Sequence, residues 1–567
     1  MKNPPKLILR LIAVFVSCLH PEISMAQVTG PSDAGRVNDR VKEPLSIEVP
    51  QSQPQLGGKV VSQAAPAGSE KISFILKDIV LSGGENISKD KALESYSDFL
   101  DKEITLDKVW FIASRLTDIY QKEGYFLSRV YVPNQEIGSG RVTLNVVEGY
   151  ISEVSLDDLA KENSLASQWV NRLVNKKPLK SQELESLLLR LNELAGHNYR
   201  AVLEFPSDKN APEGASRLSI LTAPERMRGQ TVIDNYGSRF LGPEEISQQL
   251  SFSVLPNQKT NMTLLSDIQS RELRYGGITQ YIPLSYQWDM DLAASITGAR
   301  PGDTLKVQDI ISKSKNYSVG VTFHQIKQRE EGLSYRVSYE VRDASSKILG
   351  SFPLSKDHIR MISFGLNYQR QDNYGGYNLG GMTFSQGLKN FGASEAGDDN
   401  LSRAQAKPGR SKLEISYSRV QSLPKPLPRG FSVIGSLSGQ LASGPLYASE
   451  EFGYGGQNFG RAYDSSEITG DNGVSGSLEL RYQGIPKFYY ITMMPYGFYD
   501  IGKVWNKDVG QKEPLSGSSA GFGIKLASNL GLSTNFGMAF PLTREIAAPL
   551  NGDKQGPRYM LQLSYNF

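Results

Sequence analysis

The last nine residues of the chain alternate in chemical character without interruption. On a strand the two sets would lie on opposite faces, Tyr559, Leu561, Leu563, Tyr565 and Phe567 against Met560, Gln562, Ser564 and Asn566. A strand with one apolar face, one mostly polar face and an aromatic residue at its end is typical of an outer-membrane barrel, which has lipid outside and water inside. A strand of an ordinary β-sandwich can alternate in the same way, so this segment alone leaves both architectures open.

Residues 1–26 have the parts of a secretory signal peptide. Lys2, Lys6 and Arg10 give a positive start, and Leu11–Cys18 is a short apolar run. Residues 24–26, Ser-Met-Ala, offer small side chains for cleavage. No later segment approaches the roughly 18 continuous apolar residues of a membrane helix, so we expect an exported mature protein without a helical anchor.

The composition argues against several classes of function. The single cysteine, Cys18, lies in the expected signal peptide, so no disulfide is expected in the mature chain. The net charge of +3 comes from nearly balanced basic and acidic residues, which argues against a nucleic-acid binder. The sequence has no phosphate-binding glycine loop and no G-x-S-x-G motif, and its histidines are scattered: His20, His197, His324 and His358. We therefore expect no metal, no cofactor and no catalytic activity.

Residues 27–70 are rich in Pro, Gln, Ser, Gly and Ala. Such a composition buries too little apolar surface to fold alone, so most of the segment is expected to be linker. Asp33–Glu43 differs, because a capping residue is followed by Val37 and Val41, four residues apart, and then by Pro44. This stretch is either a short polar helix or disordered.

Residues 71–150 change to a mixed α and β pattern. The apolar spacing predicts strands over 72–81, 126–132 and 141–147 and helices over 89–101 and 106–123. The order strand, helix, helix, strand, strand indicates a small α+β module.

The same order then repeats in residues 151–223. Here the pattern predicts strands over 151–156, 202–205 and 216–221 and helices over 165–173 and 181–194. The chain is therefore expected to contain two consecutive modules of one kind.

Three motifs follow one another along the chain: EGYFLSRVYVPNQEIGSGRVTLNVVEGYISEV (Glu123–Val154), DNYGSRFLGPEE (Asp234–Glu245) and FGRAYDSSEITGDNG (Phe459–Gly473). Together they resemble the outer-membrane transporters of two-partner secretion. The first motif is similar to the first polypeptide-transport-associated (POTRA) module of that family, and the second to its first barrel strand and hairpin. The third resembles the loop that the wider superfamily, including the barrel-assembly insertase, folds back into its barrel.

The resemblance implies two POTRA modules, residues 71–150 and 151–223, followed by a transmembrane antiparallel β-barrel over 224–567. Residues 224–567 also alternate as barrel strands do, for example where Leu413, Ile415 and Tyr417 share one face. At about 20 residues per strand with its turn, this segment accommodates about 16 strands, the number that the resemblance implies. In the first module the resemblance identifies four motif residues, Gly124, Tyr125, Glu148 and Gly149.

An open pore of this size would leak, so we expect something to occupy it. By position, Asp33–Glu43 resembles the plug helix of the family. The second candidate is the loop that carries Gly460, Arg461, Tyr463 and Asp464, in which Gly-Arg-Ala-Tyr stands where many relatives have Val-Arg-Gly-Tyr.

An arginine inside a barrel needs a carboxylate partner, because it cannot lose its charge. Leu478 and Leu480 flank Glu479, so Glu479 faces the lumen if the leucines face lipid. Asp500 shares its face with Phe498, and an aspartate in lipid would be very unfavourable, so we expect this face to point inward. The resemblance favours Asp500 as the partner of the loop arginine, with Glu479 second.

The resemblance also implies a function. The POTRA modules would capture a large, unfolded, Sec-exported partner protein in the periplasm, and the barrel would conduct it to the cell surface, with activation of a haemolysin-like partner as a further possibility. The barrel would be monomeric in the lipid of a Gram-negative outer membrane. Tyr565 and Phe567 would be read by the barrel-assembly machinery during biogenesis.

Three other functions are open to a chain of this kind. An insertase of other barrels is the nearest, although such relatives usually carry more periplasmic modules. A gated porin or receptor would not explain the tandem modules, and a surface lipase or protease would need a nucleophile beside His324 or His358, where no such motif occurs. The sequence does not identify the secreted partner.

Overall fold

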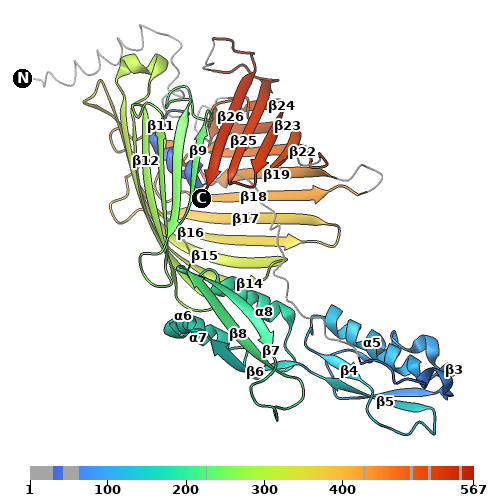
Figure 1. Cartoon of the computed structure of the whole chain (residues 1–567). Helices are drawn as coiled ribbons and strands as arrows, with labels where there is room; N and C mark the ends of the chain where they lie inside the picture. The colour runs from blue at the N-terminus through green and yellow to red at the C-terminus, as the bar shows by residue number, and fades with distance from the viewer. Residues whose placement is uncertain are drawn as a thin grey trace, which may run out of the picture. The chain divides into compact units, whose positions relative to one another are not determined.

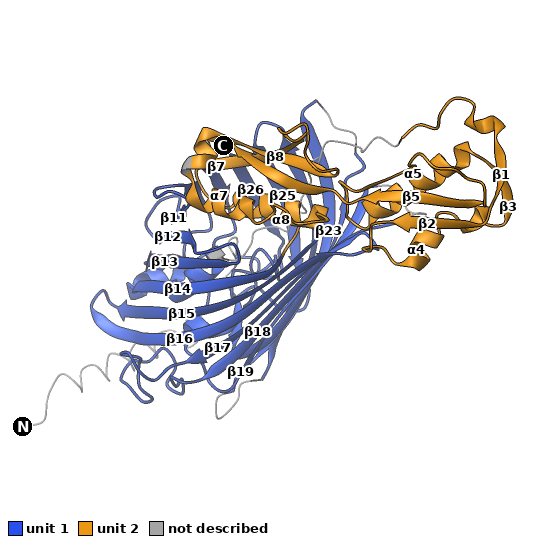
Figure 2. Cartoon of the chain, turned by 90° about the horizontal axis from the view of Figure 1, so that it is seen from below, with its two compact units in different colours: residues 1–49, 226–326, 330–567 blue, residues 50–225, 327–329 orange. Residues whose placement is uncertain are grey.

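The computed structural model describes residues 30–42, 63–224, 227–424, 430–485, 489–507, 513–547, 549 and 552–567. The expected signal peptide, residues 1–26, and most of the expected linker lie outside the described residues. The chain forms two compact units, one of residues 1–49, 226–326 and 330–567 and one of residues 50–225 and 327–329 (Figure 2). No helix in the described part of the chain is long and apolar enough to cross a membrane.

The larger unit is a closed β-barrel of sixteen strands (Figure 1). Its strands are β9 (Arg228–Asp234), β10 (Glu245–Phe252), β11 (Lys259–Asp267), β12 (Leu273–Pro283), β13 (Trp288–Ala299), β14 (Ile311–Lys327), β15 (Glu331–Ile348), β16 (Phe352–Gln371), β17 (Gly376–Gly387), β18 (Ser411–Ser422), β19 (Phe431–Ala442), β22 (Asn472–Tyr482), β23 (Ile491–Trp505), β24 (Leu515–Ser528), β25 (Leu532–Pro541) and β26 (Arg558–Asn566). The last strand pairs with the first, with Ser564 opposite Val232, so the sheet has no open edge. The predicted barrel and its strand number are confirmed.

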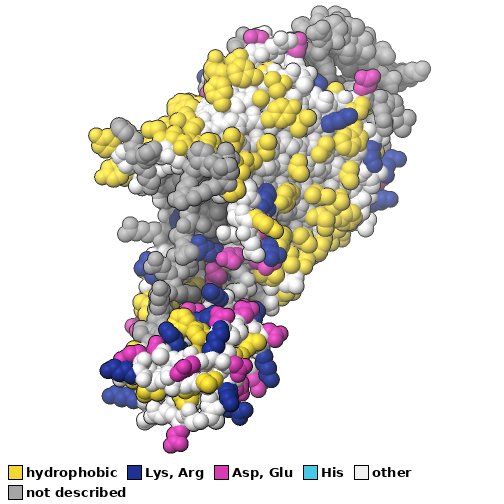
Figure 3. All heavy atoms as spheres, turned by 90° about the vertical axis from the view of Figure 1, so that its right-hand side faces the viewer, with side chains coloured by type: hydrophobic (Ala, Val, Ile, Leu, Met, Phe, Trp, Pro, Cys, Tyr) yellow, Lys and Arg dark blue, Asp and Glu magenta, His cyan; other side chains and the backbone are white. Residues whose placement is uncertain are grey.

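Side chains alternate between the outside and the lumen along each strand. On β22, Leu478 and Leu480 are 57 % and 45 % exposed, whereas Glu479 between them is 6 % exposed. Strand β26 has the predicted pattern, because Tyr559 and Leu561 are exposed and Met560 is buried. Hydrophobic side chains gather over the barrel wall in Figure 3, as expected for a surface in contact with lipid.

Two segments lie inside the barrel unit in addition to its wall. Helix α3 (Ala34–Lys42) forms where the sequence left a short helix or a disordered segment open. The long connection between β19 and β22 contains η4 (Ala448–Glu450) and the short hairpin of β20 (Phe452–Tyr454) and β21 (Ile468–Gly470). A further short helix, η3 (Asp303–Gln308), follows β13.

The smaller unit contains two modules with the same topology. In the first, β2 (Asp78–Ser82), β5 (Arg141–Val147) and β4 (Arg129–Tyr131) form the sheet, with the helices α4 (Lys89–Leu93) and α5 (Asp107–Lys122). In the second, the sheet is β6 (Tyr150–Leu156), β8 (Ala215–Pro224) and β7 (His197–Glu204), with the helices α6 (Asp158–Glu162), α7 (Ser164–Asn171) and α8 (Ser181–Leu191). In both, the first strand pairs in parallel with the last, which occupies the centre of the sheet.

Three predicted elements of the first module were wrong in detail. The strand expected over 72–81 is two strands, β1 (Ser73–Leu76) and β2, interrupted at Lys77. The reason is that β2 pairs with β5, whereas β1 pairs with β3 (Lys102–Thr105), which the sequence analysis missed. The helix expected over 89–101 ends at Leu93, where the buried Ser95 hydroxyl donates back to the Ala92 carbonyl, and η2 (Ser97–Phe99) follows. The strand expected over 126–132 is shortened to β4, and η1 (Ser69–Lys71) precedes the module.

Candidate functional site

The loop of residues 443–471 places its tip against the inner face of the barrel wall. Gly460 has φ +80°, a left-handed conformation that favours glycine, and a Cβ there would lie 2.7 Å from the Tyr454 ring. Ala462 and Tyr463 are each 1 % exposed. Ala462 is not among the residues with positive φ, so this position does not require the glycine that many relatives have. The tip is therefore a packed element.

Arg461 contacts Asp500 through both its side chain and its backbone. Its Nε and Nη2 donate to the two carboxylate oxygens of Asp500 at 3.0 and 2.9 Å. The backbone N–H groups of Gly460 and Arg461 donate to Oδ2 of the same carboxylate at 3.2 and 3.1 Å. Asp500 is fully buried, and the hydroxyl of Ser477 donates to its Oδ1 at 2.7 Å. This bidentate geometry fixes both the orientation of the guanidinium and the path of the loop backbone.

Glu479 is a second carboxylate partner of Arg461. Nη1 of Arg461 donates to its Oε2 at 2.5 Å. Its other oxygen accepts from Arg481 at 2.5 Å and lies 3.6 Å from Nζ of Lys525. The guanidinium carbon also lies 3.5 Å from the centre of the Phe498 ring, a cation–π arrangement. Both carboxylates indicated by the sequence analysis thus contact the arginine.

Tyr463 and Asp464 connect the loop tip to β24, to β26 and to the connection between β25 and β26. The Tyr463 hydroxyl lies 3.0 Å from the carbonyl oxygens of Ser518, on β24, and Arg544. Arg558, on β26, donates to the Tyr463 carbonyl at 2.7 Å and to Oδ1 of Asp464 at 3.0 Å. The loop therefore contacts β22, β23, β24 and β26 from inside.

Helix α3 is held in the lumen mainly by polar contacts. Asp39 accepts two hydrogen bonds, at 2.9 and 3.0 Å, from the buried guanidinium of Arg342 on β15. Arg40 pairs with Glu245 on β10 at 2.8 Å. Arg36 donates to Ser466 of the loop at 3.2 Å and to the Ala448 carbonyl of η4 at 2.9 Å, so the helix touches the loop as well as the wall.

A small apolar contact accompanies these polar ones. Ala34 and Val37 of α3 are 2 % and 3 % exposed and pack with apolar side chains of the lumen, among them Leu265, Leu273 and Tyr275. Val41 lies at the edge of this cluster. The helix thus buries one narrow stripe, as the spacing of Val37 and Val41 indicates.

The glycines of the POTRA motif lie at the junction of the two modules. Gly124 ends α5 with φ +92°, and its carbonyl accepts the N–H of Ser181 at 2.8 Å. Gly149 accepts the N–H of Leu179 at 3.0 Å, and a Cβ at Gly149 would lie 2.3 Å from that of Leu127. Both glycines therefore accept backbone hydrogen bonds from the second module, and the missing side chain of Gly149 leaves room for Leu127 of the first module.

The other two motif residues belong to the first module. Tyr125 is 8 % exposed in the core beside Tyr120, with 6.1 Å between the ring centres. Glu148 accepts a hydrogen bond from Asn86. Burial, with a smaller contribution from the Glu148 charge, raises the pKa of Tyr120 to about 12, and its hydroxyl donates to the Gly84 carbonyl at 2.8 Å.

At the end of the chain, Tyr565 and Phe567 lie on the outer face, 48 % and 47 % exposed, with their rings stacked 6.0 Å apart. Phe567 exchanges two backbone hydrogen bonds of 3.0 Å with Gly229, next to the start of β9. Its ring covers Gly229, where a Cβ would lie 2.3 Å from the ring. The terminal residue therefore lies beside the closure of the barrel.

Sequence reasoning missed several residues of this lumen, notably Arg342, Glu245, Ser477 and Arg558. Each occupies a polar, inward position in an alternating strand, which is the only local signal that the sequence offers. Their partners are set by pairing between distant strands, which alternation does not specify. No group of three His, Cys, Asp or Glu side chains in the described part of the chain is arranged to hold a metal ion.

Comparison with known proteins agrees with this architecture. The chain is 22 % identical over 556 residues to the heme/hemopexin transporter protein HuxB of Haemophilus influenzae, covering 93 % of each chain. It is 21 % identical over 511 residues to the outer membrane transporter CdiB of Escherichia coli, covering 85 % of this chain and 81 % of that protein.

Solved structures show the same fold. CdiB of E. coli aligns with a TM-score of 0.66 at 17 % identity, over 90 % of this chain and 94 % of that one. BamA of Haemophilus ducreyi lacking POTRA domains 1–3 aligns with a TM-score of 0.52 at 11 % identity, over 87 % of this chain and the whole of that one.

Two family profiles match the chain itself. Residues 74–149 match the ShlB-type POTRA domain. Residues 214–524, more than half of the chain, match the haemolysin secretion/activation protein ShlB/FhaC/HecB. The barrel belongs in the outer membrane, and its POTRA modules face the periplasm. The chain is thus a member of the ShlB/FhaC/HecB family, the outer-membrane transporters of two-partner secretion.

Proposed function

We propose that this protein captures one large, unfolded, Sec-exported partner protein through its POTRA modules and conducts it through the barrel. The observation that carries the proposal is the combination of two such modules with a barrel whose loop tip is fixed to the lumen wall by Arg461. A pore for passive diffusion would require neither the POTRA modules nor the fixed loop tip.

Capture is best supported at the edge of the second module. Strand β7 spans eight residues at one edge of its sheet, whereas the edge strand β4 of the first module spans three. The N–H of Val130 on β4 is already taken by the Thr117 hydroxyl at 2.9 Å. On β7 the side chain of Asn192 binds the N–H and carbonyl of Tyr199, at 2.8 and 3.1 Å, in the position of a neighbouring strand. An extended client segment would continue this pairing beyond Tyr199 through main-chain hydrogen bonds.

In this proposal α3 plugs the resting barrel and leaves it for transport, whereas the Arg461 loop stays. The plug relies on contacts that water and salt can replace, including the half-exposed carboxylate of Asp39. The loop relies on Asp500, which is fully buried. Removing one partner of a buried ion pair costs ~3–5 kcal/mol, so the loop is the more permanent occupant.

The decisive experiment measures secreted partner in the medium against folded transporter in the outer membrane. Arg461→Ala should abolish secretion while the barrel still assembles, since the lipid-facing residues are unchanged. Arg461→Lys should rescue only in part, because an ammonium group cannot reproduce the bidentate contact with Asp500. The matched control is Arg271→Ala, at an exposed arginine of a surface loop.

Two further variants test whether Arg461 and Asp500 act as one unit. Asp500→Ala should resemble Arg461→Ala, and the double variant should be no worse than either, as expected for residues that act as one unit. Normal secretion by all three variants would refute the role of the pair.

We also propose that Phe567 is the residue through which the barrel-assembly machinery recognises the chain. Phe567→Lys should lower the amount of folded barrel, measured by heat-modifiable mobility in outer-membrane fractions. The control is Tyr559→Lys, at an equally outward position of the same strand. If the two variants assemble equally well, recognition does not depend on the terminal position.

Assembly of other barrels is a second candidate function, favoured by the fold shared with BamA. The two functions differ in their clients. Depletion of this protein should leave the other outer-membrane barrels at their normal level if it is a secretion transporter, and should lower them if it is an insertase.

A further inference from the structure

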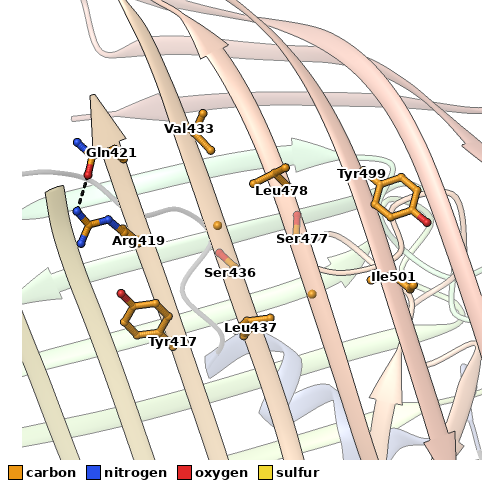
Figure 4. Close-up of a pocket in the computed structure, with 12 residues that line it drawn as sticks. Tyr417, Arg419, Gln421, Val433, Ser436, Leu437, Ser477, Leu478, Tyr499 and Ile501 are labelled. Atoms are coloured by element: carbon orange, nitrogen blue, oxygen red, sulfur yellow. Dashed lines mark hydrogen bonds between the residues drawn. The ribbon is translucent and has the colours of Figure 1, made fainter. Parts of the chain in front are cut away.

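The outer wall of the barrel has a groove across β18, β19, β22 and β23. Its volume is about 460 Å³, and Figure 4 views it from the outside. Apolar side chains line it, including Leu437, Leu478, Tyr499 and Ile501. These four are 44–57 % exposed on the face that contacts lipid. The groove is therefore a recess in the membrane-facing surface.

Two outward-facing glycines form the floor of the groove. Gly435 lies opposite Leu478 and Arg419, and Gly476 lies opposite Leu437 and Ile501. A Cβ at Gly435 would meet nothing within 4 Å, so the space above it is open. The missing side chains, flanked by large ones on the neighbouring strands, leave room for a flexible hydrocarbon chain.

A charged pair lies at one end of the groove. Arg419 faces outward on β18, in the same row as Tyr417, and Figure 4 shows its contact with Gln421. It pairs at 2.6 Å with Asp372, in the turn between β16 and β17. The two side chains are 31 % and 22 % exposed, so both remain accessible.

This end of the groove lies at the periplasmic boundary of the membrane. The POTRA modules precede β9, so β9 starts on the periplasmic side, and strand direction alternates around the barrel. Strands β16 and β18 accordingly end on the periplasmic side, near Asp372 and Arg419. Charged side chains on a lipid-facing wall are costly except at the headgroup level, where this pair lies.

We propose that the groove is a binding site for one phospholipid of the periplasmic leaflet that carries an aminophosphate headgroup. One acyl chain lies over Gly435 and Gly476. The phosphate accepts hydrogen bonds from Arg419, and the ammonium group contacts Asp372. A zwitterionic headgroup complements an arginine–aspartate pair, whereas an anionic headgroup without an amine satisfies only the arginine.

The experiment is native mass spectrometry of the full-length protein, purified in a mild detergent and exposed to equal amounts of phosphatidylethanolamine and phosphatidylglycerol. The wild type should retain one phosphatidylethanolamine in preference to phosphatidylglycerol by about tenfold, equivalent to ~1.4 kcal/mol. Gly435→Leu fills the groove and should lose the retained lipid. The matched control is Gly298→Leu, since a Cβ at Gly298 also meets nothing within 4 Å. It should retain the lipid as the wild type does.

A second variant tests the headgroup independently. Arg419→Gln should keep the bound chain but bring the ratio of the two lipids close to one. Equal retention by Gly435→Leu and the wild type would overturn the site, and so would retention of detergent only. No preference between the two lipids in the wild type would overturn the headgroup assignment. If Gly435→Leu fails to show the heat-modifiable folded form, the lipid ratio in Arg419→Gln decides.

Discussion

Helices α3 and α5 both pack against other parts of the protein, but they are held in opposite ways. Helix α5 spans 16 residues and buries an apolar stripe in the first module, including Val109, Ile112 and Leu116. Helix α3 spans nine residues, buries Ala34 and Val37, and makes its other contacts through charged and polar side chains.

The difference bears on the proposed departure of α3 from the lumen. Water cannot replace the packing contacts of an apolar stripe. Removing α5 would therefore expose the apolar core of its module to water at a cost in free energy. The charged groups of α3 regain hydration when it leaves, which offsets most of what they lose. A helix held mainly by polar contacts is therefore suited to reversible departure, and a helix held by an apolar core is suited to permanence.

The largest effect should come from the apolar helix. Leu116→Ala removes a fully buried side chain and should destabilise the first module by ~2–5 kcal/mol. Protease cleavage within residues 71–150 of the full-length protein should accelerate, while the heat-modifiable shift of the barrel stays unchanged. The matched control is Asp118→Ala, at an exposed position of the same helix. Equal cleavage of the two variants would contradict the comparison.

An intermediate effect is expected at the polar helix. Asp39→Ala combined with Arg40→Ala removes the pairs with Arg342 and Glu245. Each pair joins a partly exposed side chain of α3 to a buried side chain of the wall. At about 1 kcal/mol or more for each pair, the open fraction should rise by roughly tenfold or more. Single-channel recording in planar bilayers measures that fraction. The control is Lys407→Ala, at an exposed lysine of a surface loop. Unchanged gating would mean that the apolar contacts of Val37 hold the helix.

The smallest effect is expected at a helix start in the second module. Asp157 caps α6, accepting the N–H of Ala160 at 2.9 Å, and also accepts the hydroxyl and N–H of Thr222. Although burial raises its pKa, these hydrogen bonds, with Thr222 first, hold it below the usual value. Asn caps a helix about as well as Asp, but its amide nitrogen cannot accept from Thr222, so Asp157→Asn should cost ~1 kcal/mol at neutral pH.

The pH dependence of that effect follows from the direction of the shift. A lowered carboxyl pKa stabilises the folded state above the unfolded-state pKa of about 4, and this contribution is lost as the pH falls through the folded-state value. Hydrogen exchange over residues 158–171 of the full-length protein should separate Asp157→Asn from the wild type at pH 7 and converge with it in acid. A difference that does not depend on pH would assign the effect to packing.

Much of the fold could be predicted because its signals are local. Alternation assigned the faces of β22 and β26, and helical spacing located α5 within one residue at each end. Strand β3 was missed because its four residues, Lys102–Thr105, are stabilised by pairing with β1 and carry little apolar pattern of their own. Local sequence patterns predict a helix or strand that has an apolar face of its own. They miss a short strand that forms only by pairing with another strand.

The contacts in the lumen could also be predicted only in part. Alternation, together with the loop motif, indicated Asp500 and Glu479 as partners of Arg461, and both are in contact with it. Helix α3 was left open because its partners Glu245 and Arg342 are 205 and 303 residues away along the chain. Alternation predicts which face of the sheet a side chain lies on, but not its position along the barrel axis. That position depends on the register between neighbouring strands.

The positions of α3 and the loop of residues 443–471 also determine which part of the lumen each of them occupies. Helix α3 contacts β10, β12, β13 and β15, whereas the loop tip contacts β22, β23, β24 and β26. If α3 leaves the lumen, as proposed, it vacates one sector of the cross-section and leaves the other occupied. A polypeptide in transit would then move along an eccentric path, with β-strands on one side and the fixed loop on the other. The lining of such a channel is asymmetric in cross-section, so the two sides of a passing chain would meet different surfaces.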